Sequence, residues 1–275
     1  MKKIIIASVL IGVLWFTQFR YIEPDKTYTM ICNDKIIDIN FAQNTKKILY
    51  DSSKINTLKP LFDIGINYCK IDNILYISAG VVFKYSLIDK KLTKTSINGH
   101  LLTCIKDKKV IFYKKENKLY KYMINNKMSK FIFDMRDSNK NWLDFDRGVA
   151  IVNNQLFFND KSVLYRYDLN TEEVIKSTIK YCNVVQNANI KDKLLCSNRA
   201  YAKEKKSYFI VDFKTHKKEY IDLPDIKNVF YDNELDGIFY TRYDWDFVHM
   251  KEYRPSFFYN IKNHTEYRFS KDCHF

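Results

Sequence analysis

Glycine and proline are scarce in this sequence, with only 6 and 4 residues among 275. Loops that bind phosphate through backbone amides need several glycines at fixed spacing, and neither a Walker loop nor the dinucleotide-binding glycine pattern occurs. The nucleophile elbow G-x-S-x-G is also missing. Nucleotide-binding and serine-hydrolase functions are therefore disfavoured, and no glycine- or proline-rich linker divides the chain into domains.

Patterns of metal ligands are equally sparse. The 6 cysteines include no CxxC pair, so a structural zinc site is not expected, and the 5 histidines include no HxxxH or HExxH pattern. Two acidic pairs, Asp144/Asp146 and Asp244/Asp246, could share a calcium ion or serve as the carboxylates of a glycosidase, although neither fits an EF-hand loop. We predict no cofactor and no metal site.

Charged residues are absent from Ile4 to Phe19, a run that follows Met1-Lys2-Lys3 and ends before Arg20. The run is longer than the apolar core of a typical secretory signal, roughly 7–15 residues, and shorter than a typical spanning helix of roughly 20. It has no small-x-small cleavage pattern, which favours an uncleaved hydrophobic helix in residues 1–20 that anchors the chain in a membrane; a cleaved signal peptide is the alternative. The basic start favours a cytoplasmic N-terminus, so we expect residues 21–275 to be exported, either anchored or released as a periplasmic or secreted domain.

Acidic residues are outnumbered, since 46 Lys and Arg against 32 Asp and Glu give a net charge of +14. Without the three positive charges of Lys2, Lys3 and Arg20, the body retains +11. On an exported domain this charge favours an anionic lipid, a surface polysaccharide or an acidic protein as partner, and nucleic acid is not expected. The lysines are scattered, so they could also simply solvate turns and outer strands.

Aliphatic and aromatic residues, in contrast, are plentiful and recur with period two. Six triplets have such residues at i, i+2 and i+4, the spacing that places three side chains on one face of a strand. A turn rich in Asn, Asp and Thr and a second short strand follow, as in Val163 to Thr178, so each copy reads as a hairpin. The triplets are Ile37/Ile39/Phe41, Phe83/Tyr85/Leu87, Tyr120/Tyr122/Ile124, Tyr165/Tyr167/Leu169, Phe209/Val211/Phe213 and Phe257/Tyr259/Ile261.

The spacing of these copies predicts the fold. Their central residues are 37 to 48 positions apart, which is the length of a propeller blade. In five copies a polar turn and an apolar strand precede the triplet, as in Asp72-Asn73 followed by Ile74 to Ser78, and continuous apolar runs suit strands buried on both faces. We therefore predict an all-β, six-bladed β-propeller of four-stranded antiparallel blades over residues 21–275, in preference to a β-sandwich.

The segment Tyr167-Asp168-Leu169-Asn170-Thr171 resembles the blade repeat of bacterial propellers such as the TolB-like and quinoprotein-like families. The resemblance extends over most of Tyr28 to Phe269. Those families often have a glycine in the turn that follows, where this chain has Glu172, His216 or His264. The resemblance implies a propeller fold and, by itself, no activity.

The first copy contains its second and third strands, from Tyr28 onward, but no clear inner strand. The ring either closes with a three-stranded blade or takes a strand from the tail, Lys271 to Phe275, and the sequence leaves both open. Cys32 and Cys273, near opposite ends of the ring, could form a disulfide if the first and last blades touch. Two further cysteines, Cys69 and Cys104, occupy equivalent places in successive copies and are expected to be small buried residues.

Long connections converge on one rim of the predicted ring. Neighbouring strands alternate in direction, so the b–c and d–a connections, with strands lettered a to d from the axis outward, share one rim. The segments 134–148, 197–207 and 242–255 all belong to this long-loop rim. Loops on a rigid scaffold often bind, and Trp, Tyr and Arg dominate binding interfaces. The candidate binding residues are Trp142, Asp144, Asp146, Arg147, Arg199, Tyr201, Arg242, Tyr243, Asp244, Trp245, Asp246, His249 and Arg254.

We therefore predict an interaction module of the cell envelope that binds through the long-loop rim. Two alternatives stay open: an envelope hydrolase or lyase with carboxylates on the same rim, and a structural accessory subunit without a ligand. Trp142 and Trp245 could instead pack beneath their own loops, in which case the rim would offer little binding surface.

Overall fold

The computed structural model describes residues 27–32, 35–40, 45–52, 67–78, 80–135, 148–160, 163–185, 187–190, 192–198, 208–221, 223, 227–232, 237–242, 244–246, 251–253, 256–262, 264–270 and 273–274. The predicted N-terminal hydrophobic helix and the domain boundary at residue 20 lie outside these residues. Within the described ranges, no helix has the length and apolar character needed to cross a membrane.

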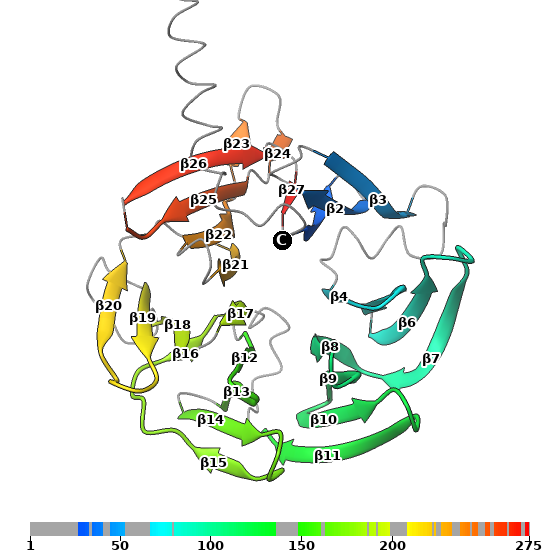
Figure 1. Ribbon diagram of the computed structural model, residues 1–275, viewed down its shortest axis with the longest axis horizontal. Helices are drawn as coiled ribbons and strands as arrows, with labels where there is room; N and C mark the ends of the chain where they lie inside the picture. The colour runs from blue at the N-terminus through cyan, green and yellow to red at the C-terminus, as the bar shows by residue number, and fades with distance from the viewer. Residues whose placement is uncertain are drawn as a thin grey trace, which may run out of the picture.

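Six small sheets stand side by side in a ring, which confirms the predicted six-bladed propeller (Figure 1). Blade 1 comprises, from the axis outward, β27 (Cys273–His274), β1 (Tyr28–Cys32), β2 (Lys35–Asn40) and β3 (Thr45–Asp51). Blade 2 comprises β4 (Asn67–Ile71), β5 (Ile74–Ser78), β6 (Val81–Ser86) and β7 (Leu92–Asn98). Blade 3 comprises β8 (His100–Ile105), β9 (Val110–Lys115), β10 (Lys118–Met123) and β11 (Met128–Asp134). Blade 4 comprises β12 (Ala150–Val152), β13 (Gln155–Asp160), β14 (Val163–Asp168) and β15 (Val174–Lys176). Blade 5 comprises β16 (Asn183–Val184), β18 (Lys193–Ser197), β19 (Tyr208–Asp212) and β20 (Lys218–Ile221). Blade 6 comprises β21 (Lys227–Asp232), β22 (Gly237–Thr241), β25 (Ser256–Asn260) and β26 (Thr265–Ser270).

The burial of a strand follows its distance from the axis. The second strands β5, β9, β13 and β22 are buried almost throughout, because neighbouring blades pack on both of their faces. These strands are the continuous apolar runs of the sequence. The outer strand β11 is mostly exposed and carries Lys130, and lysines on a free edge prevent pairing with another chain.

Aromatic side chains connect the third strands of blades 2 and 4 to the blade before them. Tyr85 of blade 2 meets Tyr50 of blade 1 edge to face, with ring centres 5.0 Å apart. Tyr165 of blade 4 similarly lies 4.9 Å from Phe133 of blade 3. The predicted triplets therefore supply the core between blades, where burial of apolar surface stabilises the fold by at most about 25 cal/mol per Å².

The C-terminal strand β27 closes the ring. It pairs antiparallel with β1, and the register sets Cys273 opposite Cys32 and His274 opposite Ile31. The tail thus provides the inner strand that blade 1 lacks in the sequence, and a three-stranded first blade is excluded. Across the same junction, the ring centre of Tyr28 lies 5.2 Å from that of Phe239 in blade 6.

Blade 5 departs from the predicted pattern. Its inner strand β16 has two residues, and the connection to β18 contains a further strand, β17 (Asn187–Ile190), where a short turn is expected. β17 pairs in parallel with β12 and makes blade 4 a five-stranded sheet. The prediction of four strands in every blade is therefore wrong for blade 4. The extra strand satisfies backbone groups on the inner edge of β12 that would otherwise lack partners.

The turns between third and fourth strands use a left-handed residue other than glycine. Glu172 and His216 have φ angles of 61° and 57°. Each lies four residues after an aspartate, Asp168 or Asp212, whose carboxylate accepts two backbone N–H groups of the turn. These hydrogen bonds offset a conformation that costs L residues roughly 1–2 kcal/mol, so the turn forms in a glycine-poor chain.

Ion pairs join neighbouring blades. Lys121 of β10, which is almost fully buried, and Lys130 of β11 both pair with Glu172 in a turn of blade 4. Hydrogen bonds from these two lysines lower the pKa of Glu172 to about 2. Lys70 of blade 2 pairs in the same way with the buried Asp38 of blade 1. Charge therefore complements apolar packing in holding the blades together.

Candidate functional site

Antiparallel pairing divides the connections between two rims. The a–b and c–d turns, such as 72–73 and 87–91, form what we call the short-turn rim, and the b–c and d–a connections form the long-loop rim. The long-loop rim has four connections of ten residues or more: 52–66, 135–149, 198–207 and 242–255. Sequence reasoning misses the first of these, because it contains no Trp, Tyr or Arg.

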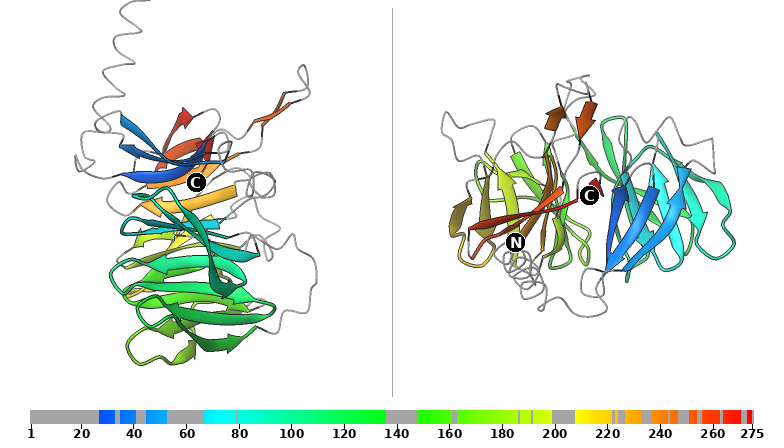
Figure 2. Two further views of the ribbon diagram at one scale, coloured as in Figure 1. Left: turned by 90° about the vertical axis from the view of Figure 1, so that its right-hand side faces the viewer. Right: turned by 90° about the horizontal axis from the view of Figure 1, so that it is seen from above.

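A two-stranded hairpin projects from the long-loop rim. Its strands are β23 (Asp244–Asp246) and β24 (Lys251–Tyr253), which pair antiparallel with Trp245 opposite Glu252. The hairpin belongs to none of the six blades and stands away from the ring (Figure 2). The backbone of β23 is therefore among the first parts of this rim that an approaching partner meets.

The structure describes few side chains of the predicted binding surface. Asp244, Trp245 and Asp246 are described as strand backbone only. Whether these side chains gather into one surface stays a prediction. Nine predicted site residues lie outside the described ranges: Trp142, Asp144, Asp146, Arg147, Arg199, Tyr201, Tyr243, His249 and Arg254.

Arg242, at the base of the hairpin, makes its contacts within blade 6. Its guanidinium lies 4.3 Å from the ring centre of Phe257, pairs with Glu266, and donates to the Tyr240 hydroxyl at 3.0 Å. Tyr240 donates in turn to Glu266 at 2.5 Å, and burial raises the pKa of this tyrosine. These contacts join β22, β25 and β26, so Arg242 supports the blade from which the hairpin projects.

A buried carboxylate lies at the rim end of β13. Asp160 is 7% exposed, and its Oδ1 has no hydrogen-bond partner in the part of the chain that is described. The neighbouring Asn159 donates to the Cys182 carbonyl and accepts from the Val184 amide, each at 2.7 Å, which fastens blade 4 to blade 5. Because a buried oxygen needs a donor, Asp160 is a point at which a ligand or covering loop can bond. In the sequence it is only the last polar residue of an apolar strand.

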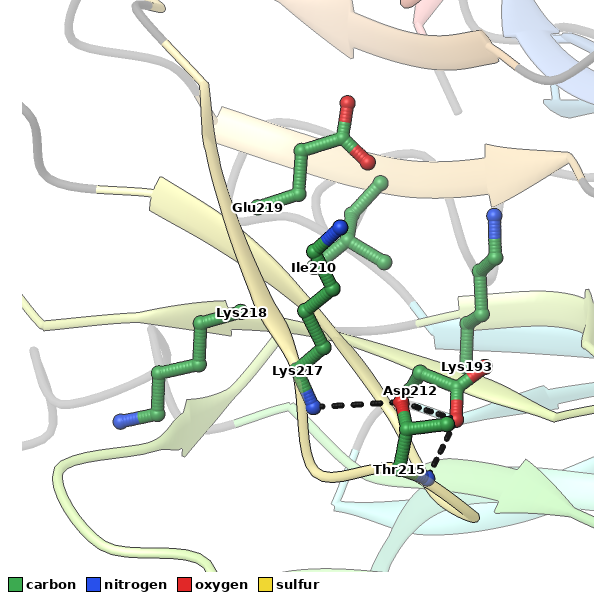
Figure 3. Close-up of a pocket in the computed structure, with 7 residues that line it drawn as sticks. All are labelled: Lys193, Ile210, Asp212, Thr215, Lys217, Lys218 and Glu219. Carbon is green, nitrogen blue, oxygen red and sulfur yellow. Dashed lines mark hydrogen bonds between the residues drawn. The ribbon is translucent and has the colours of Figure 1, made fainter.

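A hollow of about 260 Å³ lies on blade 5 against the hairpin of β19 and β20 (Figure 3). Hydrogen bonds from the backbone and hydroxyl of Thr215 lower the pKa of the Asp212 carboxyl. Lys218 extends away from these two residues, with its ammonium 4.6 Å from the Phe209 ring centre, and burial lowers its pKa. The polar groups here therefore serve mainly to hold the turn. The lining residues are Lys193, Ile210, Asp212, Thr215, Lys217, Lys218 and Glu219.

Histidines and acidic residues form no metal cluster in the described ranges, where no three His, Cys, Asp or Glu side chains come close enough to hold an ion. His100 has its pKa lowered, first by burial and then by the nearby charge of Lys114, so its imidazole is neutral at pH 7. His264 lies in a c–d turn with Nδ1 3.0 Å from the Tyr259 hydroxyl. Both are explained by their local surroundings.

Two disulfides lie on or next to the first two strands of the blades. Cys69 of β4 is bonded to Cys104 of β8 and links blades 2 and 3, and Cys182 is bonded to Cys196 in blade 5. The expectation that Cys69 and Cys104 are small buried residues is wrong, since both are half-buried and bonded to each other. Because Cys69 and Cys104 occupy equivalent positions on neighbouring inner strands, their Cα atoms lie 6.2 Å apart, a distance that suits a disulfide.

Cys32 of β1 is also disulfide-bonded. The backbone register of β1 and β27 sets Cys273 directly opposite it. This arrangement supports the predicted disulfide between the first strand and the last, and the pairing itself stays a prediction for peptide mapping.

Comparisons with known proteins concern the fold alone. No protein-family model and no curated protein matches the chain. One similar solved structure is PorZ, an essential bacterial surface component of the type-IX secretion system of Porphyromonas gingivalis, with 8% identity and a TM-score of 0.40 over 90% of this chain and 38% of that one. Another is the N-terminal domain of Nup159, with 10% identity and a TM-score of 0.41 over 73% of this chain and 60% of that one.

The chain thus spans less than two thirds of either similar structure, and similarity at this level says nothing about its function. The six blades themselves confirm the resemblance to β-propeller repeat proteins at the level of the fold.

Proposed function

We propose that this chain is an exported β-propeller that captures a partner of the cell envelope through its long-loop rim. The observation that carries the proposal is the asymmetry between the rims. All four connections of ten residues or more, and the projecting hairpin β23–β24, belong to one rim. A rigid ring that holds several loops on one side is a common basis for binding. The partner we propose is a protein or an anionic envelope component, and not nucleic acid.

Disulfide bonding supports the export part of the proposal. Five of the 6 cysteines, Cys32, Cys69, Cys104, Cys182 and Cys196, are disulfide-bonded. Disulfides persist in oxidising compartments and are rare in the cytoplasm. This agrees with the uncharged run of residues 4–19, which reads as a signal or an anchor.

Crosslinking and pull-down from intact cells test the proposal. The variant Trp245→Ala with Tyr253→Ala removes two aromatic side chains from the hairpin and leaves Arg242, which supports blade 6, in place. We expect capture of the partner to fall at least tenfold. The matched control is Ile175→Ala with Tyr220→Ala, two exposed apolar residues on outer strands. Undiminished capture by the hairpin variant would rule out this surface and favour an accessory subunit that uses another face.

An envelope hydrolase or lyase is the alternative function. It needs two carboxylates held at a set distance across the bond that is cleaved. The change of all four rim aspartates, 144, 146, 244 and 246, to asparagine separates the two functions. The binding module keeps capturing its partner in that variant, whereas an enzyme of this kind loses turnover.

A further inference from the structure

Large apolar side chains that remain exposed are unevenly distributed over the ring. Seven such residues occur among the described ones, and six of them lie in a c–d turn or on the outer strand that follows it. The seventh, Tyr181, lies in a d–a connection. The c–d turns are part of the short-turn rim, so the exposed apolar residues concentrate on that rim and on the outer strands that start there. The six are Ile48, Ile88, Met128, Phe131, Ile175 and Tyr220.

Exposed lysines lie beside these apolar residues. Lys90 and Lys91 follow Ile88 in the same turn, and Lys127 precedes Met128. The same neighbourhood recurs in blades 1, 4 and 5. Within the described residues, eleven exposed lysines on the short-turn rim and outer strands take part in no ion pair: Lys46, Lys47, Lys90, Lys91, Lys94, Lys106, Lys108, Lys127, Lys176, Lys217 and Lys262.

Most carboxylates on the short-turn rim are already engaged. Asp72 pairs with Lys109, and Asp192 pairs with Lys214. Glu172 is held by two lysines, as described above. Asp168 and Asp212 accept backbone amides of their own turns. Among the described residues of this rim and of the outer strands, the exposed acids without an ion pair are Asp89, Asp107, Asp134, Glu173 and Glu219. The unpaired lysines outnumber these acids, so the described part of this surface presents positive charge to solvent.

The chain enters the ring on the same rim. β1 runs from Tyr28 to Cys32 and turns into β2 on the long-loop rim, so its first residue lies at the opposite, short-turn end. Thr27, just before it, is exposed. Twenty-six residues precede Thr27 in the sequence, and they include the uncharged run from Ile4 to Phe19.

We propose that the short-turn rim rests on a bilayer surface that contains anionic lipid. Exposed apolar side chains such as Ile88 and Met128 then lie at the boundary of the headgroups, and the neighbouring lysines contact lipid phosphates. An apolar and basic surface of this kind binds anionic membranes through burial and charge together. The inference goes beyond the proposed function, since it concerns the opposite rim and directs the long loops away from the membrane.

Protection of free sheet edges explains only part of the pattern. Lysines on outer strands such as β11 do prevent pairing with another chain. Ile88, however, is in a turn and is 70% exposed, so it neither protects an edge nor fills the core. An apolar side chain in that position is unfavourable in water and favourable at a headgroup boundary.

Lysine modification of the full-length chain tests the proposal. The chain is incubated with nanodiscs of zwitterionic lipid or of the same lipid with anionic phosphatidylglycerol, and acetylation rates are read by mass spectrometry. We expect Lys90, Lys91 and Lys127 to react at least threefold more slowly with anionic nanodiscs. Lys115 and Lys118, at the b–c turn on the long-loop rim of blade 3, are the internal control and keep their rates. Equal rates at the first three lysines, or protection of the control pair instead, would overturn the proposal.

Charge reversal with matched variants provides a second readout. Lys90→Glu with Lys91→Glu alters the short-turn rim, and Lys115→Glu with Lys118→Glu makes the same change of charge on the other rim. We expect only the first variant to lose the protection of Lys127 by anionic nanodiscs. Protection that persists in that variant would contradict a membrane contact at this rim. Capture of a partner by the long-loop rim is measured separately, so the two proposals can fail independently.

Discussion

The junction between blades 3 and 4 and the junction that closes the ring at blade 1 are built differently. The first combines a large apolar cluster around Phe158 with the paired lysines that hold Glu172. The second uses the two-residue strand β27, the ring contact between Tyr28 and Phe239, and a small described cluster of Met30, Cys32, Ile37 and Ile39. Consecutive blades can therefore rely on packing, whereas the two distant ends depend on a short strand and, as we predict, on a disulfide between Cys32 and Cys273.

The largest effect is expected in the apolar junction. Phe158 is 1% exposed and packs against Phe133 and Tyr165, with ring centres 5.3 and 5.8 Å away. Phe158→Ala should lower the free energy of unfolding by about 4 kcal/mol, because it leaves a cavity between the blades. Denaturant unfolding measures the change. The control Phe131→Ala, at an exposed position, should change stability by about 0.5 kcal/mol or less, and equal losses in the two variants would refute packing as the main source of stability at this junction.

The closing junction should be the next most sensitive. The chain-entropy model gives more than about 4.7 kcal/mol for a loop as long as that from Cys32 to Cys273, and measured losses are usually smaller than the model, so Cys32→Ala with Cys273→Ala should cost about 4 kcal/mol. Cys182→Ala with Cys196→Ala, a pair 14 residues apart, should cost about 3 kcal/mol in the same model. Thermal unfolding under non-reducing conditions compares the two variants. Peptide mapping that finds Cys32 bonded to a cysteine other than Cys273 would disprove the closing disulfide.

The ion pairs between blades 3 and 4 should have a smaller effect that depends on pH. The pKa of Glu172 is about 2 in the fold, below the ordinary 4.5, so its contribution is complete above pH 4.5 and disappears as the pH falls towards 2. Because Glu172 is 36% exposed, Glu172→Gln should cost only about 1 kcal/mol at pH 7. Unfolding of both proteins from pH 7 to pH 2 checks this, and a difference that stays constant with pH would contradict it.

The smallest effect is expected in a c–d turn, which belongs to neither junction. His216→Gly removes the steric cost of the left-handed conformation at this position. Glycine also increases the conformational entropy of the unfolded chain, so the free energy of unfolding should rise by at most about 1 kcal/mol. His216→Val should lower stability, because a β-branched residue is strained at positive φ. Melting temperatures of the two variants should therefore move in opposite directions. A stabilised valine variant would mean that the turn has relaxed to another conformation.

The ring and its blades were predictable because their signals are local. The triplets at Tyr85 and Tyr165 have strict period two, and the strand at Ile74 to Ser78 is a continuous apolar run between polar turns. The parallel strand β17 was not predictable, since four residues are too few to establish a period and its partner lies in another blade.

Contacts between blades could also not be predicted from the sequence, because they depend on the distance between the blades. The disulfide from Cys69 to Cys104 follows from the spacing of inner strands and not from any Cys motif. In the candidate site, the alternating direction of the strands made it predictable which connections share the long-loop rim. The sequence does not single out Asp160, because what distinguishes this residue is that its Oδ1 is buried without a hydrogen-bond partner among the described residues. From the sequence Arg242 is predicted to be a surface binding residue, whereas in the structure its guanidinium stacks on the ring of Phe257.

The strand that completes blade 1 is synthesised after every other described strand of the ring. Residues 32 and 273 pair across almost the whole chain, so a ribosome or an export channel releases blades 2 to 6 before β27. During that interval β1 has an unpaired inner edge, and a nascent or truncated chain is an open arc. Such intermediates are the species that chaperones and proteases of the receiving compartment encounter, so protein quality control there would act before β27 is released.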